Sequence, residues 1–220
     1  MGHFLAVSAF RDQNVQSVSE AVIAYSNHFD CECDLLTADE PNDACDALVF
    51  PPDNGWTVIL WPSYFNIYDI ELCRDVSSTL AAIVSTVHVY DGDYWAHALI
   101  ESGTVRDVFA SMPYYFAESP EDAARLTAQW SGNANVFGDV LGVSPDSIAP
   151  YFVHLPEDGS PLDRIAFSDD EFPLDDIWVF TDFWRRIGVS YPDPPTNFAR
   201  ILRFNRRFDR KLPSSNEFEL

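Results

Sequence analysis

The stretch IVSTVHVYDGDYWAHALIESGTVRDVFA, residues 83–110, decides the fold class of this chain. It contains three runs of apolar, β-branched and aromatic residues that have the length and composition of strands. Asp91-Gly92 and Ser102-Gly103 separate the runs, and such pairs favour tight hairpin turns. The stretch therefore predicts a three-stranded antiparallel meander, with strands over 83–90, 94–100 and 104–110.

The turn at Asp91-Gly92 also predicts which side chains share a face of the sheet. If these two residues alone connect the strands, His88 lies opposite Trp95, and Thr86 lies opposite His97. Both histidines then lie on one face, on adjacent strands, near the diagonal distance of about 7–8 Å.

The same hairpin contains the candidate metal site. His88, Asp91, Asp93 and His97 bring imidazoles and carboxylates together at short spacing, as at no other place in the sequence. A metal-dependent hydrolase needs such ligands to converge on one cation, so it is the alternative function for this chain. The turn explains Asp91 without any chemistry, and the preferred function below requires no cofactor.

Helical patterns surround the meander. Val15, Val18 and Val22 begin an apolar stripe at spacings of three and four, which predicts a helix before the meander. After it, Ser119-Pro120 supplies a cap residue and a proline at the first helical position. Because the strands come in a run with helices around it, the predicted fold class is α+β, with a mixed or antiparallel sheet packed by helices. Residues 1–190 are predicted to form this single domain.

The composition excludes several classes of function. With 35 acidic and 13 basic residues, the chain has a formal charge of −22, which argues against direct binding of nucleic acid. The sequence contains no glycine-rich phosphate loop and no serine-hydrolase elbow, and its four cysteines match no common zinc spacing. No apolar run approaches the roughly 18 residues of a membrane span. Because the first residues do not form a signal peptide, the expected location is the cytoplasm.

Positive charge is concentrated at the C-terminal end. Residues 1–184 contain five arginines and 31 acidic residues, whereas residues 185–220 contain eight basic and four acidic residues. Prolines introduce the segment 191–220, and arginines are interleaved with phenylalanine, leucine and isoleucine over 196–211. This pattern predicts a basic C-terminal appendage, an amphipathic helix docked on the acidic body.

The densest acidic block is SDDEFPLDD, residues 168–176. A calcium loop needs oxygen ligands at alternate positions around a glycine, which this block lacks. Carboxylates beside aromatic residues are typical of a surface that attracts and anchors a basic protein. The predicted function is that of a non-enzymatic acidic protein that neutralises a basic protein partner, as an immunity protein or an inhibitor does; its oligomeric state is left open. The predicted partner-binding residues are Asp169, Asp170, Glu171, Asp175, Asp176 and Trp178.

Overall fold

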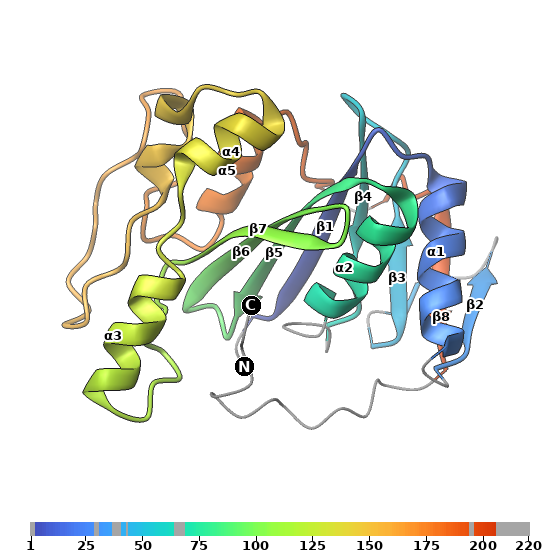
Figure 1. The fold of residues 1–220 in the computed structure, drawn as a ribbon, viewed down its shortest axis with the longest axis horizontal. Helices are drawn as coiled ribbons and strands as arrows, with labels where there is room; N and C mark the ends of the chain where they lie inside the picture. Colours follow the sequence, from blue (N-terminus) through green and yellow to red (C-terminus); the bar gives the residue numbers. More distant parts are fainter. Residues whose placement is uncertain are drawn as a thin grey trace.

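The fold is an α+β arrangement of one antiparallel sheet with helices against both of its faces (Figure 1). The structure is a computed structural model, and it describes residues 3–28, 31–36, 41–42, 44–63, 69–193 and 196–205. The strands in these ranges are β1 (Leu5–Arg11), β2 (Cys33–Leu36), β3 (Asp46–Val49), β4 (Trp56–Leu60), β5 (Ile83–Tyr90), β6 (Tyr94–Glu101), β7 (Thr104–Ala110) and β8 (Arg200–Phe204). The helices are α1 (Val15–His28), α2 (Asp69–Leu80), α3 (Pro120–Gln129), α4 (Ala134–Leu141) and α5 (Val179–Arg186), with the 3-10 helices η1 (Pro145–Ser147) and η2 (Ala149–Tyr151).

The eight strands lie in the order β2-β8-β3-β4-β1-β5-β6-β7. Each neighbouring pair is antiparallel, so the predicted α+β class and the predicted meander of β5, β6 and β7 are both confirmed. A face of an antiparallel sheet must be covered to bury its apolar side chains. In this chain both faces are covered, since a separate apolar core lies on each.

Helices α1 and α2 cover one face, and α4 and α5 cover the other (Figure 1). The stripe predicted for α1 is confirmed, because Val18 and Val22 are fully buried against the first face. On the other face, Phe183 and Trp184 of α5 are fully buried. Helix α3 packs beside the edge strand β7, and its N-cap Ser119 accepts a hydrogen bond from the Asp122 N–H, as predicted. None of the described helices is long and apolar enough to cross a membrane.

The predicted register of the first hairpin is wrong by one residue. Three residues, Asp91–Asp93, connect the strands, so that Tyr90 pairs with Tyr94. Asp91 and Gly92 both have positive φ, and Asp93 adds a third residue to the turn. A shift of one residue moves every side chain of a strand to the other face. As a result His88 pairs with Ala96, whereas His97 pairs with Val87.

The helix predicted over 196–211 is also wrong where the structure describes it. Residues Arg200–Phe204 form β8, an interior strand of the sheet between β2 and β3. Ile201, Leu202 and Phe204 are buried, while Arg203 makes a double hydrogen bond to the buried carboxylate of Asp46 on β3. A strand fits because its two faces each meet an apolar core. The rest of the predicted basic segment, 206–220, lies outside the described residues.

Candidate functional site

The four residues of the alternative metal site do not converge on one point. Because successive side chains of a strand point to opposite faces, the observed pairing places His88 and His97 on opposite faces of the sheet. Asp91 and Asp93 are exposed in the turn at the end of the hairpin. Among the residues that the structure describes, no group of three or more His, Cys, Asp and Glu side chains could hold a metal ion. The geometry therefore gives the hydrolase alternative no support.

His97 instead belongs to a buried polar chain that sequence reasoning missed. Its Nε2 atom lies 2.8 Å from the Ser85 hydroxyl, which accepts a hydrogen bond from the Trp184 indole N–H at 2.9 Å. An indole N–H can only donate, so the Ser85 oxygen accepts from Trp184, and the direction of its hydrogen bond with His97 depends on which imidazole nitrogen carries the proton. Burial lowers the pKa of His97 to about 3 and keeps the ring neutral. A serine-imidazole pair can activate a nucleophile, but both side chains are fully buried, so this pair has a structural role.

Two carboxylates of the predicted acidic block 168–176 form ion pairs with arginines of the same chain. The side chain of Asp170 is fully buried and lies within hydrogen-bonding distance of both Arg185 and Arg186. The same arginines bind Asp169, and their hydrogen bonds lower the pKa of Asp169 to about 2. Asp182 on α5 accepts the backbone N–H groups of Glu171 and Phe172. These contacts fix the loop that precedes α5.

The other predicted partner-binding residues make local contacts. Asp175 accepts a hydrogen bond from the Leu162 N–H, and Asp176 accepts one from the Trp178 N–H. The Trp178 ring is half-buried and packs beside His3, with 5.6 Å between ring centroids. Asp169 and Glu171 are exposed, and they stay predicted contacts for a basic partner. The structure adds that Asp169 is already paired.

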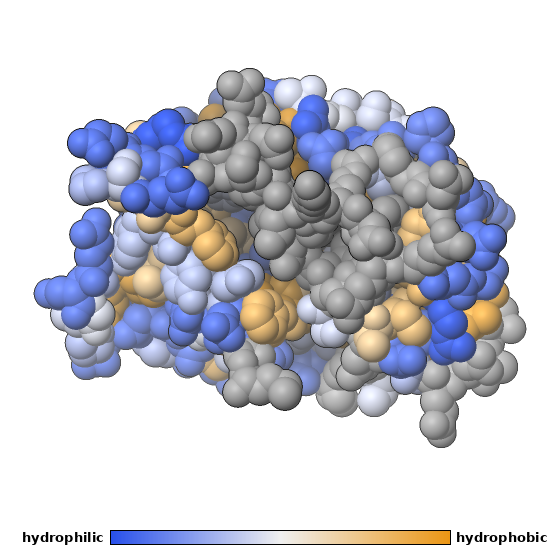
Figure 2. Space-filling view, turned by 90° about the horizontal axis from the view of Figure 1, so that it is seen from below, coloured by the Kyte–Doolittle hydropathy of each residue, from blue (hydrophilic) through white to orange (hydrophobic). Residues whose placement is uncertain are grey.

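A second acidic region lies at the end of the β5–β6 hairpin, where exposed aromatic side chains surround the turn. We call it the hairpin-end surface, and it lies beside the start of β1 at the lower edge of the sheet in Figure 1. Its two phenylalanines are well exposed, Phe4 at 37% and Phe116 at 50%. Figure 2, which shows the molecule from that side, has hydrophobic side chains at the surface among hydrophilic ones. The surface comprises Phe4, Tyr90, Asp91, Asp93, Tyr115 and Phe116.

The aromatic rings of the hairpin-end surface contact one another. Phe4 and Phe116 each meet the Tyr90 ring edge to face, with 5.0 Å between centroids. Tyr115 contacts Phe116 and also Tyr94, the first residue of β6, with 5.1 Å between ring centroids in each pair. Such edge-to-face contacts are favourable geometries for aromatic pairs, so the cluster is held in one arrangement. An exposed cluster of this kind is typical of a protein-binding surface.

The carboxylates of the hairpin-end surface have no cation within the described residues. Asp91 and Asp93 are both exposed, and no described arginine or histidine forms an ion pair with either. The Tyr115 hydroxyl donates a hydrogen bond of 2.8 Å to Asp93, and this bond raises the pKa of Tyr115 to about 12. The hydroxyl therefore stays protonated at neutral pH and orients the Asp93 carboxylate.

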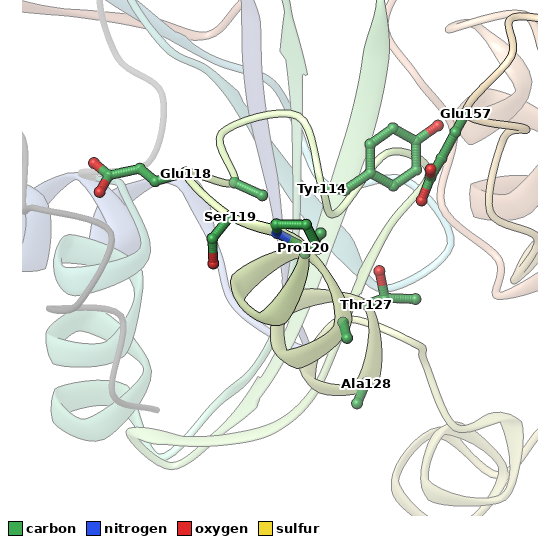
Figure 3. A pocket seen from close by; sticks show the side chains of 10 residues that line it. Tyr114, Glu118, Ser119, Pro120, Thr127, Ala128 and Glu157 are labelled. Atoms are coloured by element: carbon green, nitrogen blue, oxygen red, sulfur yellow. The ribbon is translucent and has the colours of Figure 1, made fainter.

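An open hollow of about 920 Å³ lies between α3, the segment before it and Glu157 (Figure 3). Its lining is mostly small residues of α3, such as Thr127 and Ala128, with the Tyr114 ring beside Glu157. Burial raises the pKa of Tyr114, and its hydroxyl donates to the Leu155 carbonyl. The described residues that line the hollow include no histidine, cysteine, lysine or arginine.

No protein-family model matches this chain, and comparisons with curated proteins and with solved structures each give no match.

Proposed function

We propose that this chain is a non-enzymatic binding protein that captures a basic protein partner and neutralises it, as an immunity protein or an inhibitor does. The observation that carries the proposal is the hairpin-end surface. There, exposed aromatic rings lie next to Asp91 and Asp93, for which no described residue supplies a cation. Aromatic residues provide most of the binding energy at many protein interfaces, and neighbouring carboxylates select a partner of opposite charge.

The overall charge supports the same function. A formal charge of −22 creates an attractive field for a basic protein, and such a field raises association rates by about 10- to 1,000-fold. The field acts over about 8 Å at physiological salt, so it guides the encounter but does not hold the complex. Contacts at the hairpin-end surface would then determine how long the complex lasts.

The proposal is tested by using the full chain as bait in an extract of the source cells at low salt, then purifying whatever binds. We expect a protein of high pI whose association rate falls at least about tenfold between 50 mM and 500 mM salt, and whose own activity the chain inhibits. Recovery of an acidic partner, or an association rate that salt does not change, would overturn the proposal.

A further inference from the structure

The chain itself contains an arginine site built from an aromatic ring, two carboxylates and a tyrosine. The guanidinium of Arg186 lies over the Phe167 ring, with its central carbon 4.4 Å from the ring centroid. One guanidinium nitrogen, Nη2, donates to Asp169 at 2.6 Å and to Asp170 at 2.5 Å. The Tyr151 hydroxyl donates to Asp170 at 2.8 Å and thereby orients that carboxylate. Stacking, ion pairing and orientation thus act on one guanidinium.

The hairpin-end surface presents the same groups. The Tyr115 hydroxyl donates to Asp93 at 2.8 Å, as that of Tyr151 does to Asp170. Asp91 supplies the second carboxylate, and its charge acts on Tyr115 together with that of Asp93.

The rings correspond as well. The tyrosine that binds the carboxylate contacts a phenylalanine in both places, with centroid distances of 5.8 Å for Tyr151 and Phe167 and 5.1 Å for Tyr115 and Phe116. The difference lies in the cation. No arginine among the described residues occupies the hairpin-end surface, and Phe116 is half exposed.

From this correspondence we propose that the hairpin-end surface binds an arginine side chain of the basic partner, with the guanidinium stacked on the exposed aromatic rings and paired with Asp93. The proposal rests on the function proposed above and names the group that the partner must present. Arginine fits better than lysine because its planar guanidinium can stack on a ring and bind a carboxylate through two N–H groups. A lysine ammonium supplies the charge without the planar stacking.

The experiment compares two probes of equal charge, an octa-arginine and an octa-lysine peptide, in calorimetric titrations of the full chain. Both peptides are attracted by the acidic body, so the ratio of their dissociation constants measures what is specific to arginine. We expect the wild-type chain to bind octa-arginine several-fold more tightly than octa-lysine. In Phe116→Leu, which keeps an apolar side chain without a ring face, the preference falls by about two- to fivefold.

Two further variants locate the effect. Asp93→Asn removes the paired carboxylate and is expected to weaken octa-arginine binding about two- to fivefold. Asp146→Asn removes one exposed carboxylate on η1 and is the matched control, which is expected to keep the arginine preference. All positions are exposed, and thermal unfolding of each variant confirms that it folds. Equal affinity for the two peptides in the wild type, an unchanged preference in Phe116→Leu, or an unchanged octa-arginine affinity in Asp93→Asn would overturn the proposal.

A last arm separates the partner from the chain's own C-terminal residues. Arg206, Arg207 and Arg210 are replaced together by glutamine. The ratio of the octa-arginine and octa-lysine affinities is expected to stay unchanged, because the added negative charge attracts both peptides. A several-fold gain in the arginine preference would mean that the chain's own arginines occupy the surface, and the assignment to a partner would be wrong. Absence of an arginine preference leaves the proposed function intact if the recovered partner is basic. Recovery of an acidic partner ends the proposed function whatever the peptides show.

Discussion

Replacing His97 should remove a defined part of the pH dependence of stability. Its imidazole is fully buried between β6 and α5, and burial, with a smaller contribution from His88, lowers its pKa to about 3. In the unfolded chain a histidine has a pKa of about 6.5. Between these values the unfolded chain binds a proton that the folded chain does not. The stability that His97 contributes is therefore fully present above about pH 6.5 and is lost as the pH falls towards 3.

The magnitude at pH 5 follows from the unfolded value alone, provided the folded pKa lies well below 5. The 1.5 units between pH 6.5 and pH 5 correspond to about 2 kcal/mol, at about 1.4 kcal/mol for each pKa unit. Asp107 acts in the opposite direction, because burial raises its pKa to about 6 and the folded chain takes up that proton first. A comparison between wild type and a His97 variant cancels the contribution of Asp107.

His97→Gln is the variant of choice, because its side-chain amide can either donate to or accept from the Ser85 hydroxyl but does not titrate. Urea unfolding is followed at pH 7 and pH 5 by the fluorescence of the buried tryptophans. We expect the wild type to lose about 2 kcal/mol more than the variant over this interval. His28→Gln, at the exposed end of α1, is the matched control. Equal losses in wild type and His97→Gln would refute the reasoning.

Two other predictions concern local contacts. Asp170→Asn removes the charge of a fully buried carboxylate that pairs with Arg186, so it should lower the free energy of unfolding by about 3 kcal/mol in urea titrations. Glu71→Gln, which neutralises the exposed partner of Arg74, serves as the control. Equal effects of the two substitutions would contradict this assignment. Ser119→Ala removes the side chain that caps α3 and should cost about 1 kcal/mol, measured in the same way, whereas a change near zero would mean that the cap contributes nothing.

Local patterns predicted most of the elements, and contacts distant in sequence decided what the patterns could not. Runs of apolar, β-branched and aromatic residues identified β5, β6 and β7 because each run is a complete strand. The Asp91-Gly92 pair indicated a turn but did not indicate its length, and one additional residue put His88 and His97 on opposite faces. For Arg200–Phe204, the helical reading failed because β2 and β3 lie more than 150 residues earlier and supply the hydrogen bonds of a strand.

The same contrast between local patterns and distant contacts applies to the acidic block and to the hairpin-end surface. Composition and spacing located the acidic block at 168–176, but Asp170 pairs with Arg185 and Arg186 of α5, which lie 15 and 16 residues further along the chain. The hairpin-end surface assembles Phe4, Tyr90 and Phe116 from three separate segments, so no single stretch of sequence displays it. A partial signal existed, since Tyr90 and Tyr94 flank an exposed turn with two aspartates.

The ion pairs distinguish the carboxylates that stabilise the fold from those that are available for binding. The side chains of Asp46 and Asp170, exposed by 1% or less, each pair with an arginine, because a buried carboxylate without a partner costs several kcal/mol. Asp91 and Asp93 are solvated, so folding does not require a cation beside them. Neutralising Asp93 should therefore leave stability nearly unchanged while it weakens the binding of an arginine, whereas neutralising Asp170 should do the reverse. A surface whose carboxylates matter for binding and not for stability is what an interaction site requires.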